Sequence, residues 1–235
     1  MGLGIKTKLF GIADYLFRRR CPAIRMALWD DSTQYGEFKM LFSLSGHKKS
    51  GMIVDVGAND GITCSNSYPF INRGWRAVLI EPNPKVFASL QAFHSSRSSL
   101  QFFNVACGAE AGELPLYLGS DDRTVYATLS TDESDWYSAT RSNEHVLVSV
   151  KKLETILQTA ECPQDFDILS IDTEGFDYFV LVGLNLMHFR PKVIVTEDEK
   201  PPYTHSAEKE SLLKKNGYRL AKRFHNNAVW TLITQ

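Results

Sequence analysis

Short apolar runs recur along most of the chain, and each is followed by a polar turn and a stretch with helical periodicity. Short runs that end at Gly, Pro or acidic residues are typical of buried strands, because a helix needs a longer pattern. Strands that alternate with helices indicate a mainly parallel sheet covered on both faces. The expected strands are 52–56, 77–80, 100–103, 166–171 and 192–196, and the expected helices are 62–73, 84–94, 153–159, 176–187 and 207–216.

An insertion that is rich in strands and loops is expected at about 108–150, where the alternation breaks. Residues 127–144 are polar and rich in Ser and Thr, which predicts a loop or a lid. Trp136 and Tyr137 in this stretch would either stack on a sugar ring or be partly buried aromatics. The segments of the insertion that alternate like strands are 112–118 and 146–150.

The predicted fold class is α/β, with a doubly wound, mostly parallel sheet. The last two expected strands, 218–224 and 228–233, flank a polar turn and predict a C-terminal antiparallel hairpin. Residues 1–33 are expected to form a basic, amphipathic helical extension, and residues 34–235 the main domain.

The basic extension carries six Lys and Arg residues against one acidic residue within 1–28, with apolar residues at roughly helical spacing. We favour a helix docked on the domain with its basic face in water, and the alternative is a peripheral helix on an anionic membrane. Lys6 and Lys8 interrupt the apolar core that a secretory signal needs. The expected location is therefore the cytoplasm, either free or peripheral to the inner face of a membrane.

Composition narrows the class of protein. The net charge of −1 provides no overall attraction to nucleic acid, so no nucleic-acid partner is expected. The four cysteines are far apart and form no C-x-x-C pair, which favours reduced thiols over a zinc site or a disulfide framework. No apolar run approaches the ~20 residues that span a bilayer.

Acidic and polar residues stand where four of the expected strands end. The first strand runs into the loop Asp55–Gly61, the second ends at Glu81, the third at Asn104, and the fourth at Asp172 and Glu174. In open parallel sheets, ligands bind beyond the carboxyl ends of the strands. These residues are therefore candidates for one site.

The strand-end residues suit S-adenosylmethionine. Gly57 and Gly61 allow the backbone to turn tightly and to approach a ligand. Asp55 can balance the ammonium group of the ligand, and Glu81 can accept hydrogen bonds from ribose hydroxyls. The backbone at 105–107 can meet adenine, and Asp172 would face the methyl group that is transferred.

Two other functions are consistent with this pattern. A nicotinamide-dependent oxidoreductase would use the loop G-x-G-x-x-G, but Asn59 stands where the middle glycine should be. A nucleic-acid methyltransferase is a further alternative, although the chain lacks the N-P-P-Y type of stretch that base-amine enzymes carry. Each strand-end acid alone could simply cap a helix, but several at successive strands favour a cofactor site.

Several stretches together carry a resemblance to a known family. They are Gln34-Tyr35-Gly36-Glu37, Val54–Gly61, Ser65-Asn66-Ser67-Tyr68, Gly74-Trp75, Ile80-Glu81-Pro82-Asn83-Pro84, Asn104-Val105-Ala106 and Ile171-Asp172-Thr173-Glu174-Gly175. From about Gln34 onward, the chain resembles the FkbM family of S-adenosylmethionine-dependent methyltransferases. The resemblance implies a seven-stranded, Rossmann-like class I methyltransferase that methylates a sugar hydroxyl of a glycan, a glycolipid or a small glycosylated metabolite.

The resemblance also implies roles for individual residues. Asp172 and Glu174 would be the catalytic pair beside the methyl group. One departure is Phe70-Ile71, which stand where relatives often carry an acidic residue, so no substrate contact is expected from that helix. The implied cofactor-binding residues are Gln34, Asp55, Gly57, Asn59, Asp60, Gly61, Asn66, Glu81, Pro82, Asn83, Asn104, Ala106 and Asp172.

A hydroxyl acceptor must lose its proton during attack, so a general base is expected. Asp172 is the first candidate, Glu174 the second and His145 the third. Asp172, Glu174 and Glu197 could instead hold a divalent cation such as Mg²⁺, but we favour a site without a metal because no further Asp or Asn completes a ligand set.

Overall fold

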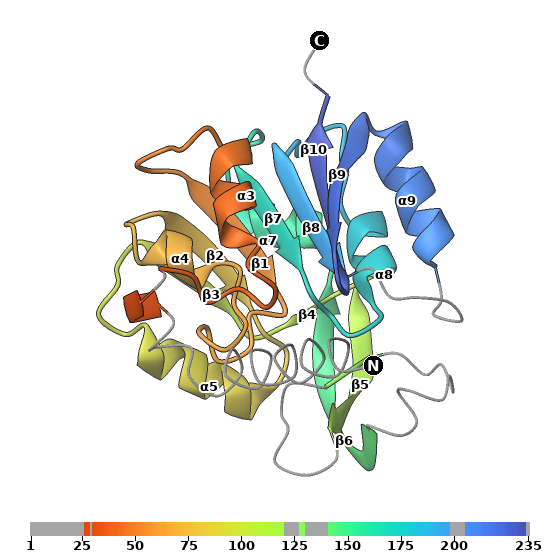
Figure 1. Ribbon diagram of the computed structural model, residues 1–235. Helices are drawn as coiled ribbons and strands as arrows, with labels where there is room; N and C mark the ends of the chain where they lie inside the picture. The colour runs from red at the N-terminus through yellow and green to blue at the C-terminus, as the bar shows by residue number, and fades with distance from the viewer. Residues whose placement is uncertain (1–25, 29, 120–126, 130–140, 198–204, 234–235) are drawn as a thin grey trace, which may run out of the picture.

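A central sheet with helices on both faces forms the body of the protein, shown as a computed structural model in Figure 1. The structure describes residues 26–28, 30–119, 127–129, 141–197 and 205–233. The basic stretch expected within 1–28, apart from its last three residues, and the aromatic pair Trp136 and Tyr137 lie outside the described residues. Among the helices that are described, none is long and apolar enough to cross a membrane.

Seven strands form the main sheet in the order β3-β2-β1-β7-β8-β10-β9. Strands β3 to β8 in this order are parallel, and β10 runs antiparallel to both of its neighbours. The predicted doubly wound α/β sheet with a C-terminal hairpin is thus confirmed. The strands are β1 (Met52–Val56), β2 (Arg76–Ile80), β3 (Leu100–Phe103), β7 (Ile168–Ile171), β8 (Val193–Glu197), β9 (Tyr218–Phe224) and β10 (Asn227–Leu232).

Side chains of the central strands alternate between two hydrophobic cores, as the two-residue period of a strand requires. In β1, Met52, Val54 and Val56 join the core that includes α7, α8 and α9, whereas Ile53 joins the core that includes α3, α4 and α5. Both faces are therefore covered, and the ends of the strands remain open for a ligand. The helices are α3 (Phe38–Leu44), α4 (Tyr68–Ile71), α5 (Pro84–Phe93), α7 (Leu153–Thr159), α8 (Asp177–Val182) and α9 (Ser206–Lys215).

A second sheet of three strands lies at the carboxyl end of the main sheet (Figure 1). Its order is β4-β6-β5, with β4 at Ala106–Cys107, β5 at Gly112–Gly119 and β6 at Arg141–Lys151. Leu116 and Val148 on its inner face pack with Phe176 into a small core of their own. The strands 112–118 and 146–150 were expected, but β4 and the full length of β6 were not.

The expected helix 62–73 is wrong over its first half, because helical residues begin only at Tyr68. The carboxylate of Asp60 accepts hydrogen bonds from the backbone N–H groups of Ile62 at 3.0 Å and Thr63 at 2.7 Å. Side-chain bonds of this kind compete with helical ones, and Cys64 has a left-handed φ of 54°. Helix α8 is likewise shorter than the expected 176–187.

A buried carboxylate joins chain segments at the amino-terminal ends of the strands, opposite the ends that were expected to bind a ligand. Asp167, just before β7, accepts hydrogen bonds from Lys48 Nζ at 2.6 Å, Lys192 Nζ at 2.8 Å and the backbone N–H of Met52 at 3.1 Å. Burial raises the pKa of Asp167, but the bonds from Lys192, Lys48 and Met52 outweigh it and hold the pKa below its usual value.

Replacing Asp167 by Asn is expected to lower the free energy of unfolding by about 2 kcal/mol at pH 7, as for a hydrogen-bonded charged group. Since the folded pKa is depressed, this stabilisation is present above the pKa of the unfolded chain and is lost as the pH falls through the folded pKa. Urea denaturation should therefore give a difference between wild type and Asp167→Asn that shrinks towards pH 3. A difference in the free energy of unfolding that stays constant with pH would contradict a stabilising role for the ion pairs of Asp167.

Candidate functional site

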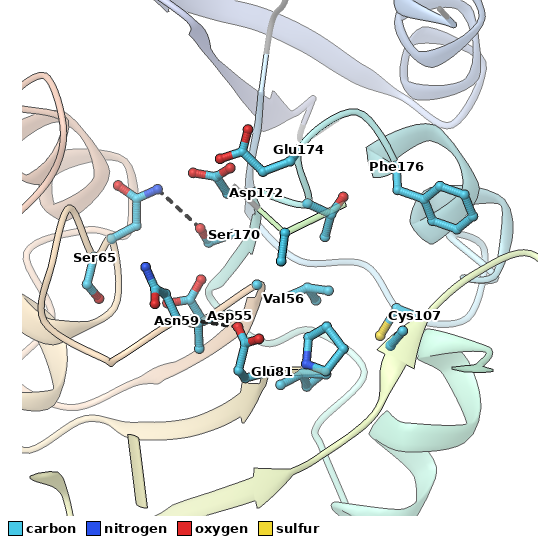
Figure 2. A pocket seen from close by; sticks show the side chains of 18 of the residues that line it. Asp55, Val56, Asn59, Ser65, Glu81, Cys107, Ser170, Asp172, Glu174 and Phe176 are labelled. Carbon is cyan, nitrogen blue, oxygen red and sulfur yellow. Dashed lines mark hydrogen bonds between the residues drawn. The ribbon is translucent and has the colours of Figure 1, made fainter. Parts of the chain in front are cut away.

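A cleft opens at the carboxyl ends of β1, β2 and β7, next to the inner face of the second sheet. The empty space in and in front of it, open solvent included, is about 1080 Å³. Figure 2 shows acidic and hydroxyl side chains on one side, and Cys107 and Phe176 on the other. The predicted site residues that line the cleft are Gln34, Asp55, Gly57, Asn59, Asn66, Glu81, Pro82, Ala106, Asp172 and Glu174.

Glu81 follows β2 and is buried in the wall of the cleft. Its Oε2 accepts a hydrogen bond from the backbone N–H of Asn59 at 3.0 Å, and Oε1 accepts one from Asn83 at 2.8 Å. Burial, the largest cause, raises the pKa of Glu81 to about 7 against the effect of these two bonds. Each oxygen keeps a second lone pair, so the carboxylate is held rigidly and can accept hydroxyl groups of a ligand.

Asp55 lies on the polar side of the cleft and is the end point of a hydrogen-bond chain. Ser67 Oγ donates to Asp55 Oδ2 at 2.5 Å, and Ser170 also hydrogen-bonds this carboxylate. Asn66 Nδ2 donates to Ser170 Oγ at 3.1 Å, which leaves the Ser170 proton for Asp55. Burial raises the pKa of Asp55, and the bonds from Ser67 and Ser170 oppose that rise. Burial outweighs these bonds, so the pKa of Asp55 stays above its usual value, and a cationic group bound beside it would favour the charged carboxylate.

Three backbone N–H groups of the loop after β1 are hydrogen-bonded to the end of β2. The N–H groups of Gly57 and Ala58 both donate to the carbonyl oxygen of Ile80, at 2.9 and 3.0 Å, and that of Asn59 donates to Glu81. A pyrophosphate needs such N–H groups for itself. These three are taken, which disfavours a dinucleotide.

Asp172 and Glu174 belong to the turn that follows β7, and both side chains lie on the polar side of the cleft (Figure 2). The Asp172 N–H donates to the carbonyl oxygen of Val56 at 3.0 Å, which joins this turn to β1. Glu174 has a left-handed φ of 50°, and its carbonyl oxygen accepts a hydrogen bond from Thr128 Oγ1 at 2.7 Å. The turn therefore places two carboxylates in the lining of the cleft.

An apolar wall forms the opposite side of the cleft. Leu116, Ala127 and Leu129 come from the insertion, and Cys107 and Phe176 complete the wall. Such a surface suits a flat aromatic base. The backbone at 105–107 was expected beside adenine, whereas Leu116, Ala127, Leu129 and Phe176 were not expected in the site, although the alternation within 112–118 already assigned Leu116 to one face of a strand.

Four predicted cofactor residues do not line the cleft: Asp60, Gly61, Asn83 and Asn104. Asn104 Nδ2 donates to the carbonyl oxygens of Glu81 and Pro82, at 2.8 and 3.0 Å. Asn83 caps helix α5 through its side chain, and Asp60 holds the turn after the loop. The structure thus gives Asp60, Asn83 and Asn104 positioning roles behind the cleft.

Two other predicted candidates lie away from the cleft. His145 is exposed on β6, beside Tyr117, and its neighbours in sequence alternate so that Val146 and Val148 face the inner core instead. Glu197 lines a second, smaller cavity at the end of β8. Within the residues that the structure describes, no group of three His, Cys, Asp or Glu side chains is arranged to hold a metal ion.

Comparison with known proteins fits this site. A family model described as the methyltransferase FkbM domain matches residues 55–220, which begin at Asp55 and include every acidic residue of the cleft. The chain belongs to the FkbM methyltransferase family. The family predicted from the sequence is confirmed, and S-adenosylmethionine is the cofactor of this class of enzymes. No curated protein matches the chain by sequence.

A solved structure of a similar protein shares the fold of this FkbM domain. The methyltransferase FkbM of Methylobacillus flagellatus KT is 15% identical, with a TM-score of 0.51 over 78% of this chain and 44% of that one. The chain therefore spans less than half the length of this relative. Fibrillarin of Aeropyrum pernix, with natively bound S-adenosyl-L-methionine, is 12% identical, with a TM-score of 0.47 over 83% of this chain and 74% of that one.

Glu81→Gln is expected to weaken the binding of S-adenosylmethionine to this FkbM domain by about 10- to 100-fold, the value of hydrogen bonds to a charged group. The amide NH₂ would face the N–H of Asn59 or Asn83. Since the wild-type pKa is about 7, its affinity should rise between pH 6 and 8 as Glu81 ionises, whereas the variant lacks this rise. Calorimetry measures the Kd of both proteins at each pH, and the ratio of the two Kd values removes any effect of the ligand's own titration. The control is Glu110→Gln, which makes the same change at an exposed side chain. A variant with wild-type affinity would contradict the role.

Proposed function

We propose that the protein transfers the methyl group of S-adenosylmethionine to a hydroxyl group of a sugar, on a glycan, a glycolipid or a small glycosylated metabolite. The observation that carries the proposal is the pair Asp172 and Glu174 on the polar side of the cleft, next to the strand ends that hold the cofactor residues. A carboxylate at this place can take the proton that a hydroxyl acceptor must lose.

The residues present fit the cofactor group by group. The buried carboxylate of Glu81 suits the two ribose hydroxyls, and the apolar wall of Cys107, Leu116 and Phe176 suits adenine. Asp55 suits the ammonium group of the methionine part. Gln34 also lines the cleft, and its amide can donate to the carboxylate of that part.

The chemistry asks mainly for alignment. When bound, S-adenosylmethionine supplies an electrophilic methyl group whose carbon–sulfur bond breaks as the hydroxyl oxygen attacks. Asp172 accepts the hydroxyl proton, with Glu174 as the second candidate for this step. The hydrogen-bonded loop after β1 and the turn after β7 keep donor and acceptor sites at a fixed separation, since the Asp172 N–H is bonded to Val56.

The charge of the cleft bears on the acceptor. Among the described residues that line it, there are four carboxylates, of Asp55, Glu81, Asp172 and Glu174, and no Lys, Arg or His. Phosphate groups would be repelled by such a lining, because like charges in a partly buried site interact strongly. This supports a sugar hydroxyl as the acceptor over a nucleic acid.

Calorimetry with S-adenosylmethionine and with a nicotinamide dinucleotide tests the donor. We expect binding of the first alone, and binding of the dinucleotide alone would overturn the proposal. Transfer of a labelled methyl group into envelope glycan, glycolipid and nucleic-acid fractions then tests the acceptor. Label in nucleic acid rather than in glycan would exclude a sugar acceptor, and activity that survives exhaustive chelation would exclude a metal at Asp172, Glu174 and Glu197.

A further inference from the structure

A buried ion pair lies behind the turn that carries Asp172 and Glu174, and its two residues have no place in the cleft itself. We propose that Asp177 and Lys209 form a clamp that positions this turn for methyl transfer. The clamp comprises Asp177, Lys209 and the groups they bind. This proposal rests on the proposed function in one respect, the catalytic role of the turn that carries Asp172 and Glu174.

Asp177, the first residue of α8, uses both carboxylate oxygens to tie strand ends together. Its Oδ1 accepts hydrogen bonds from the Thr173 N–H at 3.1 Å and from Thr173 Oγ1 at 2.6 Å. Its Oδ2 accepts one from the backbone N–H of Glu197 at 2.8 Å. The residue between the two candidate bases is thus fixed to the end of the next strand, β8.

Lys209 of α9 completes the clamp from the other side. Its Nζ lies 3.8 Å from Asp177 Oδ2 and donates to the carbonyl oxygen of Glu197. The side chains of Asp177 and Lys209 are only 3% and 9% exposed, so water screens their attraction weakly. Removal of either partner leaves the other charge buried without compensation.

The turn needs such support because of its backbone. Glu174 has a φ of 50°, a backbone conformation that residues other than Gly, Asn and Asp seldom adopt. A conformation of this kind persists only where the surrounding structure enforces it. Asp177 of the clamp fixes Thr173, the residue before Glu174. Thr128 of the insertion donates a hydrogen bond to the carbonyl oxygen of Glu174 itself. Asp177 therefore acts on the reaction through Thr173, and it is a positioning residue.

A matched pair of carboxylates allows a sharp test. Asp167 precedes β7 and Asp177 follows it, and both are buried acids that accept a hydrogen bond from a backbone N–H and form an ion pair with lysine. We would compare Asp177→Asn and Lys209→Met with Asp167→Asn, in the full chain. The measurements are thermal unfolding, the Kd of S-adenosylmethionine, kcat and the hydrogen exchange of the Thr173 amide.

The clamp variants should lose about 10- to 100-fold in kcat, as expected for small misplacements of a catalytic group, and should bind S-adenosylmethionine nearly as wild type does. Asp167→Asn should be destabilised but keep its kcat. The Thr173 amide should exchange faster in both clamp variants than in Asp167→Asn.

Other results separate the two proposals. If Asp177→Asn folds, keeps its kcat and protects Thr173 as the wild type does, the clamp is refuted. If Asp167→Asn loses kcat in the same proportion, the effect is one of stability and the clamp is also refuted. If the wild type binds no S-adenosylmethionine, the proposed function fails, while the exchange of Thr173 still tests the clamp.

Discussion

Gly57→Ala is expected to lower the free energy of unfolding by more than about 4 kcal/mol, a loss that few single substitutions reach. A Cβ atom on residue 57 would lie 1.9 Å from the carbonyl oxygen of Asp172. That neighbour is backbone and cannot swing aside, and Gly57 also has φ of 86°, which L side chains rarely adopt. Strands β1 and β7 would have to separate at their carboxyl ends, so cofactor binding should be lost as well.

Gly74→Ala is the matched control, because Gly74 has nearly the same φ of 85° but no atom within 4 Å of its would-be Cβ. It should lose only about 1–2 kcal/mol, the cost of a left-handed side-chain residue. Urea denaturation of the two variants therefore separates the close approach of strands from backbone strain. Equal losses would show that the contact with Asp172 does not matter.

Asp172→Asn is expected to reduce kcat by about 10²- to 10⁴-fold, the usual contribution of general acid–base catalysis. Asn has almost the same shape, so the bond from the backbone N–H to Val56 and the wall of the cleft should persist. The Kd of S-adenosylmethionine should change little. Single-turnover transfer of a labelled methyl group, with calorimetry on the same samples, measures both quantities.

Glu174→Gln is the companion variant, since its carboxylate belongs to the same turn. It should lose less activity than Asp172→Asn. The reverse order would assign the base to Glu174. A large rise in Kd with an unchanged kcat in Asp172→Asn would instead make Asp172 a cofactor residue only.

The sequence predicted the strand-end acids well because the signal is local. Asp55, Glu81 and Asp172 each stand at a place where an apolar run meets Gly, Pro or Thr, and parallel strands bring such places to one edge. The structure puts all three in the lining of one cleft. The same reasoning predicted strands β1 and β3 and helix α7 with their observed bounds.

The sequence could not separate ligand-facing residues from those that support them. Asn104 and Asp60 have the same polar chemistry as Asn66 and Asp55, yet their side chains bind the backbone behind the cleft. The pair Asp177 and Lys209 meets only because α8 and α9 pack together, which no short pattern records. The two-residue strand β4 gives no periodic signal, so the second sheet was incompletely expected.

The inner face of the insertion has a consequence for engineering this enzyme. Leu116 and Leu129 line the side of the cleft that we propose for the methyl donor, while Thr128, next to Leu129 in the chain, donates a hydrogen bond to the carbonyl oxygen of Glu174. A chimera that exchanges this segment to obtain a new product would therefore disturb the methyl donor and the candidate base together. Swaps that retain Leu116, Thr128 and Leu129, and vary only the outward-facing positions, are the ones that should keep turnover.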